Sequence, residues 1–179
     1  VVEDDHFENR NLYKYVEDGD WTNTQAFIRD HNAEVLRLAH GSGSILHVAA
    51  MAGHVNIVKG LMSMPDSEEL VKRQDGRGFT ALALAAHLTG NTDVAKFMLE
   101  GVSEHIRRDL LTTENNDGVI PLLLAADKGH TEMTRYLHKQ TPKDMLDKLV
   151  SVSLTTKDML DKPSVSVLLL ERCIKAEIF

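Results

Sequence analysis

One arrangement of apolar and polar positions occurs three times along the chain. A leucine is followed three residues later by two alanines, and a glycine stands shortly beyond them. Apolar residues at i, i+3 and i+4 form one face of a short helix, and the glycine begins a turn. Another apolar residue lies eight positions past each glycine. The pattern predicts pairs of antiparallel helices. Their leucines are Leu46, Leu82 and Leu122, and their second anchors are Leu61, Met98 and Leu137.

A weaker copy precedes these three, with Leu12, Val16, Gly19 and Phe27 in the corresponding places, so successive leucines are 34, 36 and 40 residues apart. In one copy Gly90 lies four residues after the second alanine instead of three, which predicts one extra residue in that turn. We expect a single domain over 1–179. Its units span about 11–41, 42–74, 75–114 and 115–155, with a partial unit at 163–179.

Each first helix is preceded by a turn signature rich in glycine and Asx residues: Gly41-Ser42-Gly43, Asp75-Gly76-Arg77-Gly78 and Asn115-Asn116-Asp117-Gly118. Asx-Gly sequences favour turns with positive φ, so we expect these segments to project as finger-like tips. Ser44 and Thr80 follow as N-terminal caps of the next helices. A helix pair of this kind is not stable alone, and stacking on its neighbours completes the core. The predicted fold class is all-α.

These residues resemble the ankyrin repeat, whose hallmark is Thr-Pro-Leu-His-x-Ala-Ala followed by a Gly-His turn. The first full copy keeps Leu46-His47, the second keeps Thr80 and Leu82, and the third keeps Pro121-Leu122. Gly53-His54 and Gly129-His130 match the turn, whereas Gly90-Asn91 departs from it. The resemblance covers about residues 11–140. It implies an ankyrin-repeat solenoid that binds a partner protein on its fingers and inner helices.

Long connections separate the units, over 64–73 and 102–113, and both have a partly helical pattern that predicts either a longer second helix or an added short one. A short duplication, Lys143–Lys148 and Lys157–Lys162, lies in the tail. The long insertions, a first helix that runs into Asp18-Gly19-Asp20-Trp21 and the terminal segment Leu168–Phe179 together resemble the plant ankyrin proteins whose repeats precede a multi-span membrane domain. That resemblance implies the cytosolic sensor or assembly domain of a stress or defence signalling protein, with membrane attachment through a region absent here.

The formal net charge of -7 argues against a nucleic-acid partner, because binding to phosphate backbones depends on Lys and Arg. The one cysteine, Cys173, forms no intrachain disulfide, which favours the reducing cytoplasm. No apolar run approaches the roughly 20 residues needed to span a bilayer. Composition therefore favours a folded domain whose partner is a protein.

Histidine, serine and glycine residues are the candidates for chemistry in this sequence. His40, His47 and His54 recur at seven-residue intervals and raise the possibility of a metal site. The ankyrin resemblance instead gives His47 and His54 a structural role, as hydrogen-bond partners of backbone in neighbouring loops. Ser42 and Ser44 lack the strand-to-helix elbow of a catalytic serine, and no glycine-rich nucleotide cradle is present. We predict no enzyme activity, no small-molecule substrate and no cofactor or metal.

By resemblance, a partner would contact the finger tips and the ledge at the end of each first helix. The predicted finger residues are His40, Gly76, Arg77, Phe79, Asn116, Asp117 and Val119, and the ledge residues are Met51, Ala52, His87, Leu88, Asp127 and Lys128. Phe79 either anchors the partner or folds back onto its neighbour. Arg77 and Phe79 form a candidate anchor pair, because Arg and aromatic residues dominate interface energies. Their joint replacement by alanine is then expected to weaken capture without unfolding the chain.

Overall fold

The computed structural model describes residues 2–31, 36 and 43–156, and all helices and turns below lie in that part of the chain. Its helices are α1 (Val2–Glu17), α2 (Trp21–Asp30), α3 (Ile45–Ala52), α4 (Val55–Met62), α5 (Ser67–Val71), α6 (Ala81–Leu84), η2 (Ala85–Thr89, a π turn), α7 (Thr92–Glu100), α8 (Glu104–Thr112), α9 (Pro121–Asp127), α10 (Thr131–Gln140) and α11 (Lys143–Thr156). No strand occurs among the described residues; an isolated bridge joins Gln74 and Thr80.

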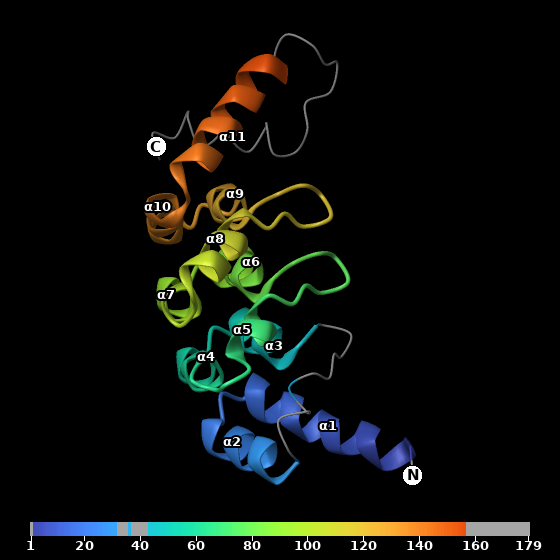
Figure 1. Ribbon diagram of the computed structural model, residues 1–179. Helices are drawn as coiled ribbons and strands as arrows, with labels where there is room; N and C mark the ends of the chain where they lie inside the picture. The colour runs from blue at the N-terminus through green and yellow to red at the C-terminus, as the bar shows by residue number, and fades with distance from the viewer. Residues whose placement is uncertain (1, 32–35, 37–42, 157–179) are drawn as a thin grey trace.

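Four helix pairs are stacked one above another (Figure 1). The first helices α1, α3, α6 and α9 pack in that order, and the second helices α2, α4, α7 and α10 form a parallel column beside them. The predicted all-α stack of antiparallel pairs is confirmed. The expected unit boundaries stay a prediction, and the partial unit at 163–179 lies outside the described residues, as do Cys173 and the second copy of the tail duplication.

The repeated leucines occupy equivalent buried positions. Leu12, Leu46, Leu82 and Leu122 are all at most 1% exposed, and each lies in the first helix of its pair. The alanines that follow are also buried, apart from the partly buried Ala126, and let neighbouring first helices approach closely, as the spacing predicted. Leucine supplies the buried apolar area, while the small alanine side chains allow the helix backbones to lie close together. This shared face holds the layers in register.

The first pair departs from the pattern in two ways. Helix α1 begins at Val2, well before the expected start of the first unit near residue 11. Phe27, expected as the second-helix anchor, is only partly buried and stacks on His31 with ring centroids 3.9 Å apart. Ile28, the next residue, is 6% exposed and belongs to the core in its place.

The extra residue of the third pair lies in the helix, and its expected place in the turn was wrong. Gly53, Gly90 and Gly129 adopt nearly the same left-handed conformation, with φ of 72°, 63° and 73°. The turn therefore keeps its geometry in every unit. The chain absorbs the additional residue as the π turn Ala85–Thr89, which directly precedes Gly90. π turns of this kind are frequent at functional positions.

The two described fingers have the same hydrogen-bonded design. In the first, Asp75 Oδ1 accepts the backbone N–H groups of Arg77 and Phe79, each at 2.9 Å. In the second, Asn115 Oδ1 accepts those of Asp117 and Val119 at 3.0 and 2.9 Å. A buried Asx side chain thus organises each tip from within. The φ values of Gly78 and Gly118, 78° and 73°, confirm the predicted left-handed turns.

Neighbouring fingers are also bonded to each other. The backbone N–H of Asn116 donates to the carbonyl of Arg77 at 3.0 Å, and its side-chain Nδ2 donates to the carbonyl of Gly76 at 3.3 Å. Gln74 Nε2 bridges the carbonyls of Gly78 and Glu114, at 2.7 and 3.2 Å. The tips therefore form one continuous surface on the side of the stack from which both loops project (Figure 1).

His47 and His54 perform the structural role that the resemblance implied. His47 Nδ1 accepts the backbone N–H of Ser44 at 3.1 Å, which leaves Nε2 to donate to the carbonyl of Phe79 in the next finger, at 3.0 Å. His54 Nε2 lies 2.7 Å from the carbonyl of Glu17 in the preceding pair. Burial lowers the pKa of His47, so the ring is neutral at pH 7.

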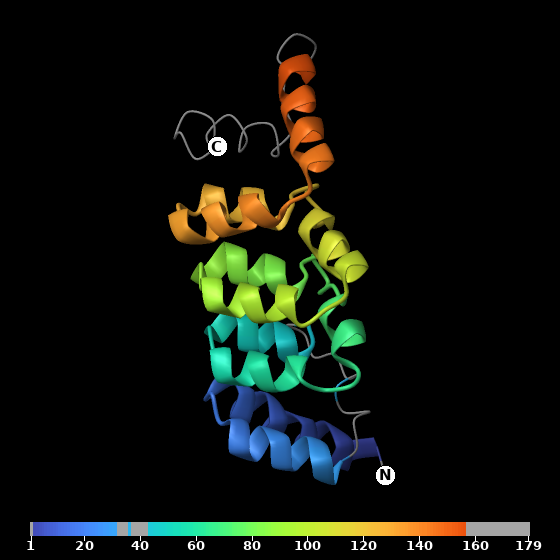
Figure 2. The ribbon, with the colours of Figure 1, turned by 60° about the vertical axis from the view of Figure 1, so that its left-hand side comes forward.

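The long connections form separate short helices. Helices α5 and α8 lie along one edge of the stack, and α11 continues above them (Figure 2). Glu68 in α5 accepts the backbone N–H of Ser103, the residue that caps α8, at 2.9 Å. Arg108 in α8 pairs with Asp144 in α11. Of the two alternatives left by the sequence, added helices are therefore observed.

Gly78→Ala is expected to destabilise the stack by about 1–2 kcal/mol or more, because a side chain strains the left-handed conformation. Its Cβ would also lie 2.5 Å from Asn116 Oδ1 and 2.8 Å from the Asn116 nitrogen. Gly76→Ala is the matched control in the same finger, since no atom lies within 4 Å of its Cβ position. Urea titration of both variants measures the difference; equal stabilities would contradict the proposed contact between fingers.

His47→Gln is expected to lower the free energy of unfolding at pH 7 by about 2–4 kcal/mol, because one or both buried partners of the ring lose their hydrogen bonds. It should also weaken the pH dependence of stability. Burial holds the folded-state pKa of His47 below its ordinary value of 6.5, so the unfolded chain binds the proton first as pH falls. Wild-type stability therefore declines from pH 7 to pH 5. Denaturant titrations at both pH values test this, and an unchanged slope in the variant would contradict it.

Candidate functional site

A groove with a volume of about 550 Å³ opens between the two described fingers and the ledge beneath them. Both fingers contribute to its walls, and the first helices of the third and fourth pairs contribute to its base. It is lined by Arg77, Phe79, His87, Asn115, Asn116, Asp117, Val119, Leu124 and Asp127. Its lining thus comes from two successive repeat units and depends on their stacking.

Arg77 and Phe79 are adjacent in the groove but differ in exposure. The Arg77 side chain is 68% exposed, whereas Phe79 is only 7% exposed. The guanidinium carbon lies 5.0 Å from the Phe79 ring centroid, and one guanidinium nitrogen lies 3.3 Å from Asp75 Oδ2. Of the two alternatives for Phe79, the structure shows the one in which it folds back. Phe79 therefore forms part of the floor and supports the arginine above it.

The π turn determines what the ledge presents to the groove. His87 lies in this turn, and its ring packs edge-on against Phe79 with centroids 5.7 Å apart. Its Nδ1 atom is buried and has no hydrogen-bond partner among the described residues. Leu88, the next residue, is 49% exposed and is the one large apolar side chain exposed in the described part of the chain. The inserted residue thus gives this ledge an apolar protrusion and an unpaired imidazole nitrogen.

Two carboxylates complete the polar lining. Asp117 stands exposed at the tip of the second finger, and Asp127 lies at the end of α9, where Lys128 approaches it to 3.4 Å. Burial and the positive charges of Lys128 and Arg77 lower the pKa of His87, against the opposing effect of Asp127. His87 is therefore neutral at pH 7, and the charged groups of the groove are Arg77 and the two aspartates.

Seven of the thirteen residues proposed from the sequence line this groove: Arg77, Phe79, His87, Asn116, Asp117, Val119 and Asp127. Val119 is only 2% exposed, so it belongs to the floor and is not displayed at a fingertip. Leu88 and Lys128 are exposed on the ledge, Gly76 lies at the first fingertip, and Met51 and Ala52 lie at the end of α3, away from the groove lining. His40 lies outside the described residues.

Sequence reasoning missed two lining residues, Asn115 and Leu124. Asn115 was grouped only with the turn, although its position matches that of Asp75, and this equivalence was the signal that it organises the second finger from inside. Leu124 belongs to the run of leucines in α9, and the repeat pattern gave it no place on the partner surface. It is 95% buried yet borders the groove, a placement that depends on the angle between neighbouring pairs.

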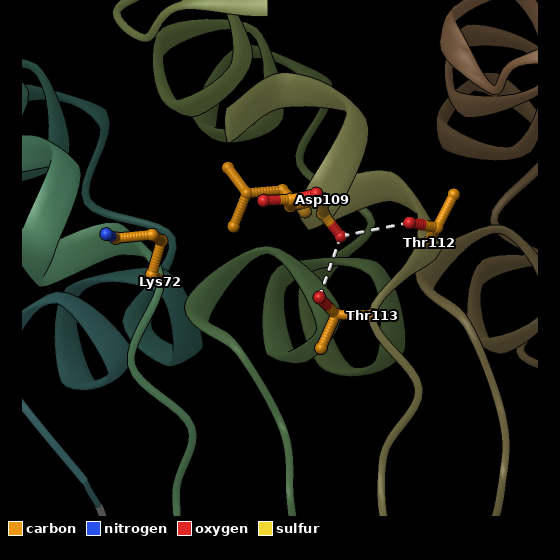
Figure 3. Close-up of a pocket in the computed structure, with 5 residues that line it drawn as sticks. Lys72, Asp109, Thr112 and Thr113 are labelled. Atoms are coloured by element: carbon orange, nitrogen blue, oxygen red, sulfur yellow. Dashed lines mark hydrogen bonds between the residues drawn. The ribbon is translucent and has the colours of Figure 1, made fainter. Parts of the chain in front are cut away.

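A second, smaller hollow of about 280 Å³ lies beside α8 and is lined by Lys72, Asp109, Leu110, Thr112 and Thr113 (Figure 3). Its polar groups are already paired. Both threonine hydroxyls donate to the backbone carbonyl of Asp109, and Lys72 Nζ lies 2.6 Å from Glu69 Oε1. The hollow therefore offers few free hydrogen-bonding groups to a ligand.

Within residues 2–31, 36 and 43–156, no three His, Cys, Asp or Glu side chains converge as metal ligands. None of the helices described has the length and apolar character required to cross a bilayer.

The family model for ankyrin repeats, in three copies, matches residues 14–109, more than half of the chain. The match begins near the end of α1 and extends into α8, and α9–α10 adds a further pair of the same design beyond it. No curated protein matches the chain. With its stacked pairs, its left-handed glycine turns and the family model in agreement, the chain belongs to the ankyrin-repeat family.

Proposed function

We propose that the groove between the two fingers, together with the ledge at Leu88, holds a segment of a partner protein. Ankyrin repeats are generally protein–protein interaction modules and are typically non-catalytic. The same scaffold serves unrelated partners, so specificity resides in the side chains of this surface. The observation that carries the proposal is the adjacency of an exposed leucine, a supported arginine and a preformed groove on one face.

Each of these features favours protein binding. Leu88 exposes apolar area beside the groove, and a partner that removes this area from water gains binding free energy. Arg77 is held by Asp75 and by the Phe79 ring, so it loses less conformational freedom on binding than a free arginine. The hydrogen bonds between fingers hold the groove walls before the partner arrives.

The buried position of Phe79 changes the choice of variants. Phe79→Ala would remove a core side chain and cost about 3–5 kcal/mol of stability, so the variant is now expected to affect folding as well as binding. Arg77 and Leu88 are exposed, and their replacement separates binding from folding.

Peptides selected from a random library displayed on phage, with the full chain as bait, supply a direct test. We expect Arg77→Ala combined with Leu88→Ala to weaken binding of the selected peptides at least tenfold, or about 1.4 kcal/mol. The melting temperature should change by only a few degrees. Arg135→Ala is a control, because that arginine is exposed on α10 and pairs only along its own helix. Retention of full affinity by the double variant would refute the proposed surface.

We propose as a second candidate that the array is the cytosolic sensor or assembly platform of a plant stress or defence signalling protein attached to a membrane. The added helices α5 and α8 support this proposal, because long connections between units are one of the features on which that resemblance rests. The sequence of the full gene product tests this second proposal. Several apolar stretches of about 20 residues beyond Phe179 would support the platform, and a further polar capping repeat would contradict it.

A further inference from the structure

Side chains at the turns bond each helix pair to the pair before it. His54 Nε2 lies 2.7 Å from the carbonyl of Glu17 in the preceding pair. Asn91 stands in the same place one layer further on, and its Nδ2 donates to the carbonyl of Gly53 at 3.3 Å. We call this end of the stack the turn end; it contains the left-handed glycines Gly19, Gly53, Gly90 and Gly129. The first two interfaces between pairs are therefore both bonded at the turn end.

His130 occupies this place in the fourth pair but makes no such bond. Its ring packs on Gly90, where an added Cβ would lie 2.5 Å from the ring. Nε2 of His130 is nevertheless buried without a hydrogen-bond partner among the described residues. The residue that corresponds to Glu17 in the third pair is Leu88, which lies in the π turn. The interface between the third and fourth pairs thus lacks the bond that this position supplies in the two preceding interfaces.

A second unpaired nitrogen lies at the same interface. The π turn that contains His87 packs against α9 of the fourth pair. The Nδ1 atom of His87 is buried and has no hydrogen-bond partner in the described part of the chain. A buried polar group without a hydrogen bond costs free energy, which it regains when water reaches it. Separation of the third and fourth pairs would therefore hydrate both nitrogens and offset part of the apolar contact that is lost.

The second helices also pack unevenly. Helix α7 packs much more extensively on α4 than on α10. The contact between α2 and α4 is also small, but there Asn56 Nδ2 donates to the carbonyl of Gly19 at 2.9 Å, in addition to the bond of His54. The third–fourth interface thus combines limited packing of its second helices with two unpaired nitrogens. Neither preceding interface has this combination among the described residues.

The fingers hold the same two pairs together at the other end of the first helices. The backbone N–H of Asn116 donates to the carbonyl of Arg77 at 3.0 Å. Gln74 Nε2 donates to the carbonyl of Glu114 at 3.2 Å. The interface is thus bonded along the fingers and less firmly held at the turn end, which is the arrangement of a hinge.

We propose that the fourth pair swings away from the third at the turn end, with the bonded fingers as the hinge. Water then reaches His87 Nδ1 and His130 Nε2, while the bonds of Asn116 and Gln74 stay in place. Because residues of both pairs line the groove, the swing changes its width. This motion is a property of the fold alone and does not depend on the proposed function.

Thiol labelling of buried cysteines measures the opening. Leu137 in α10 and Leu61 in α4 lie eight residues after their turn glycines, and both are completely buried. Leu137→Cys and Leu61→Cys in the full chain are therefore a matched pair, and each thiol reacts only when the packing around it opens. We expect the opening equilibrium constant to be about tenfold larger at Leu137→Cys, because the unpaired nitrogens favour opening. Peptide mass spectrometry assigns the label to each site. Equal constants would overturn the proposal.

Two leucine variants separate the hinge from ordinary fraying of the fourth pair. His130→Leu removes a nitrogen that forms no bond, so labelling at Leu137→Cys should slow about threefold. His54→Leu leaves the carbonyl of Glu17 without its donor, so labelling at Leu61→Cys should become about tenfold faster. Neither histidine caps its helix through its side chain, so the two variants are comparable. Responses of the same sign at the two sites would contradict the proposal.

The backbone amide of Asn116 reports on the hinge itself. It donates to the carbonyl of Arg77 across the fingers, so its hydrogen exchange requires that bond to break. We expect the opening constant from this exchange to be about tenfold smaller than the one measured at Leu137→Cys. Equal values would mean that the fourth pair leaves as a whole, and the hinge would then have to be abandoned. Melting curves confirm that each variant is folded at the temperature of labelling.

Discussion

Each helix pair in this chain has an apolar face that only a neighbouring pair can cover. The four leucines Leu12, Leu46, Leu82 and Leu122 lie on that face, and their burial requires the next layer to be present and in register. Because every layer depends on its neighbours, stability is a sum of contacts between adjacent units. The groove inherits this dependence, since its walls belong to two successive layers and exist only when those layers are stacked.

Hydrogen bonds between layers fix the relative position of neighbouring helix pairs, which apolar stacking alone does not. His47 binds the finger of the next unit, His54 binds the end of the preceding first helix, and Asn116 binds the finger before its own. Apolar contacts tolerate small sliding movements, whereas hydrogen bonds to particular carbonyls do not. These bonds therefore fix the spacing of the fingertips, on which the shape of the groove depends.

Much of the fold can be predicted from local patterns in the sequence. The repeated leucine and alanine spacing predicted the buried faces, the Asx-Gly signatures predicted the left-handed turns, and Ser44 and Thr80 were correctly expected as caps. Two features were not predictable in this way. An extra residue before Gly90 fits either a longer turn or a π turn, since both give the same spacing in the sequence. The burial of Phe79 depends on His87 and Arg77, which approach it only in three dimensions.

The π turn shows how a linear array accommodates a change in chain length. Gly90 keeps the conformation of its counterparts and α7 still packs in its column, so the added residue leaves the turn and the stacking of the second helices in place. A globular core would distribute such an insertion through many contacts, whereas here its effect ends at the next turn. Evolution can therefore remodel recognition one layer at a time by inserting or deleting a single codon, without redesigning the rest of the molecule.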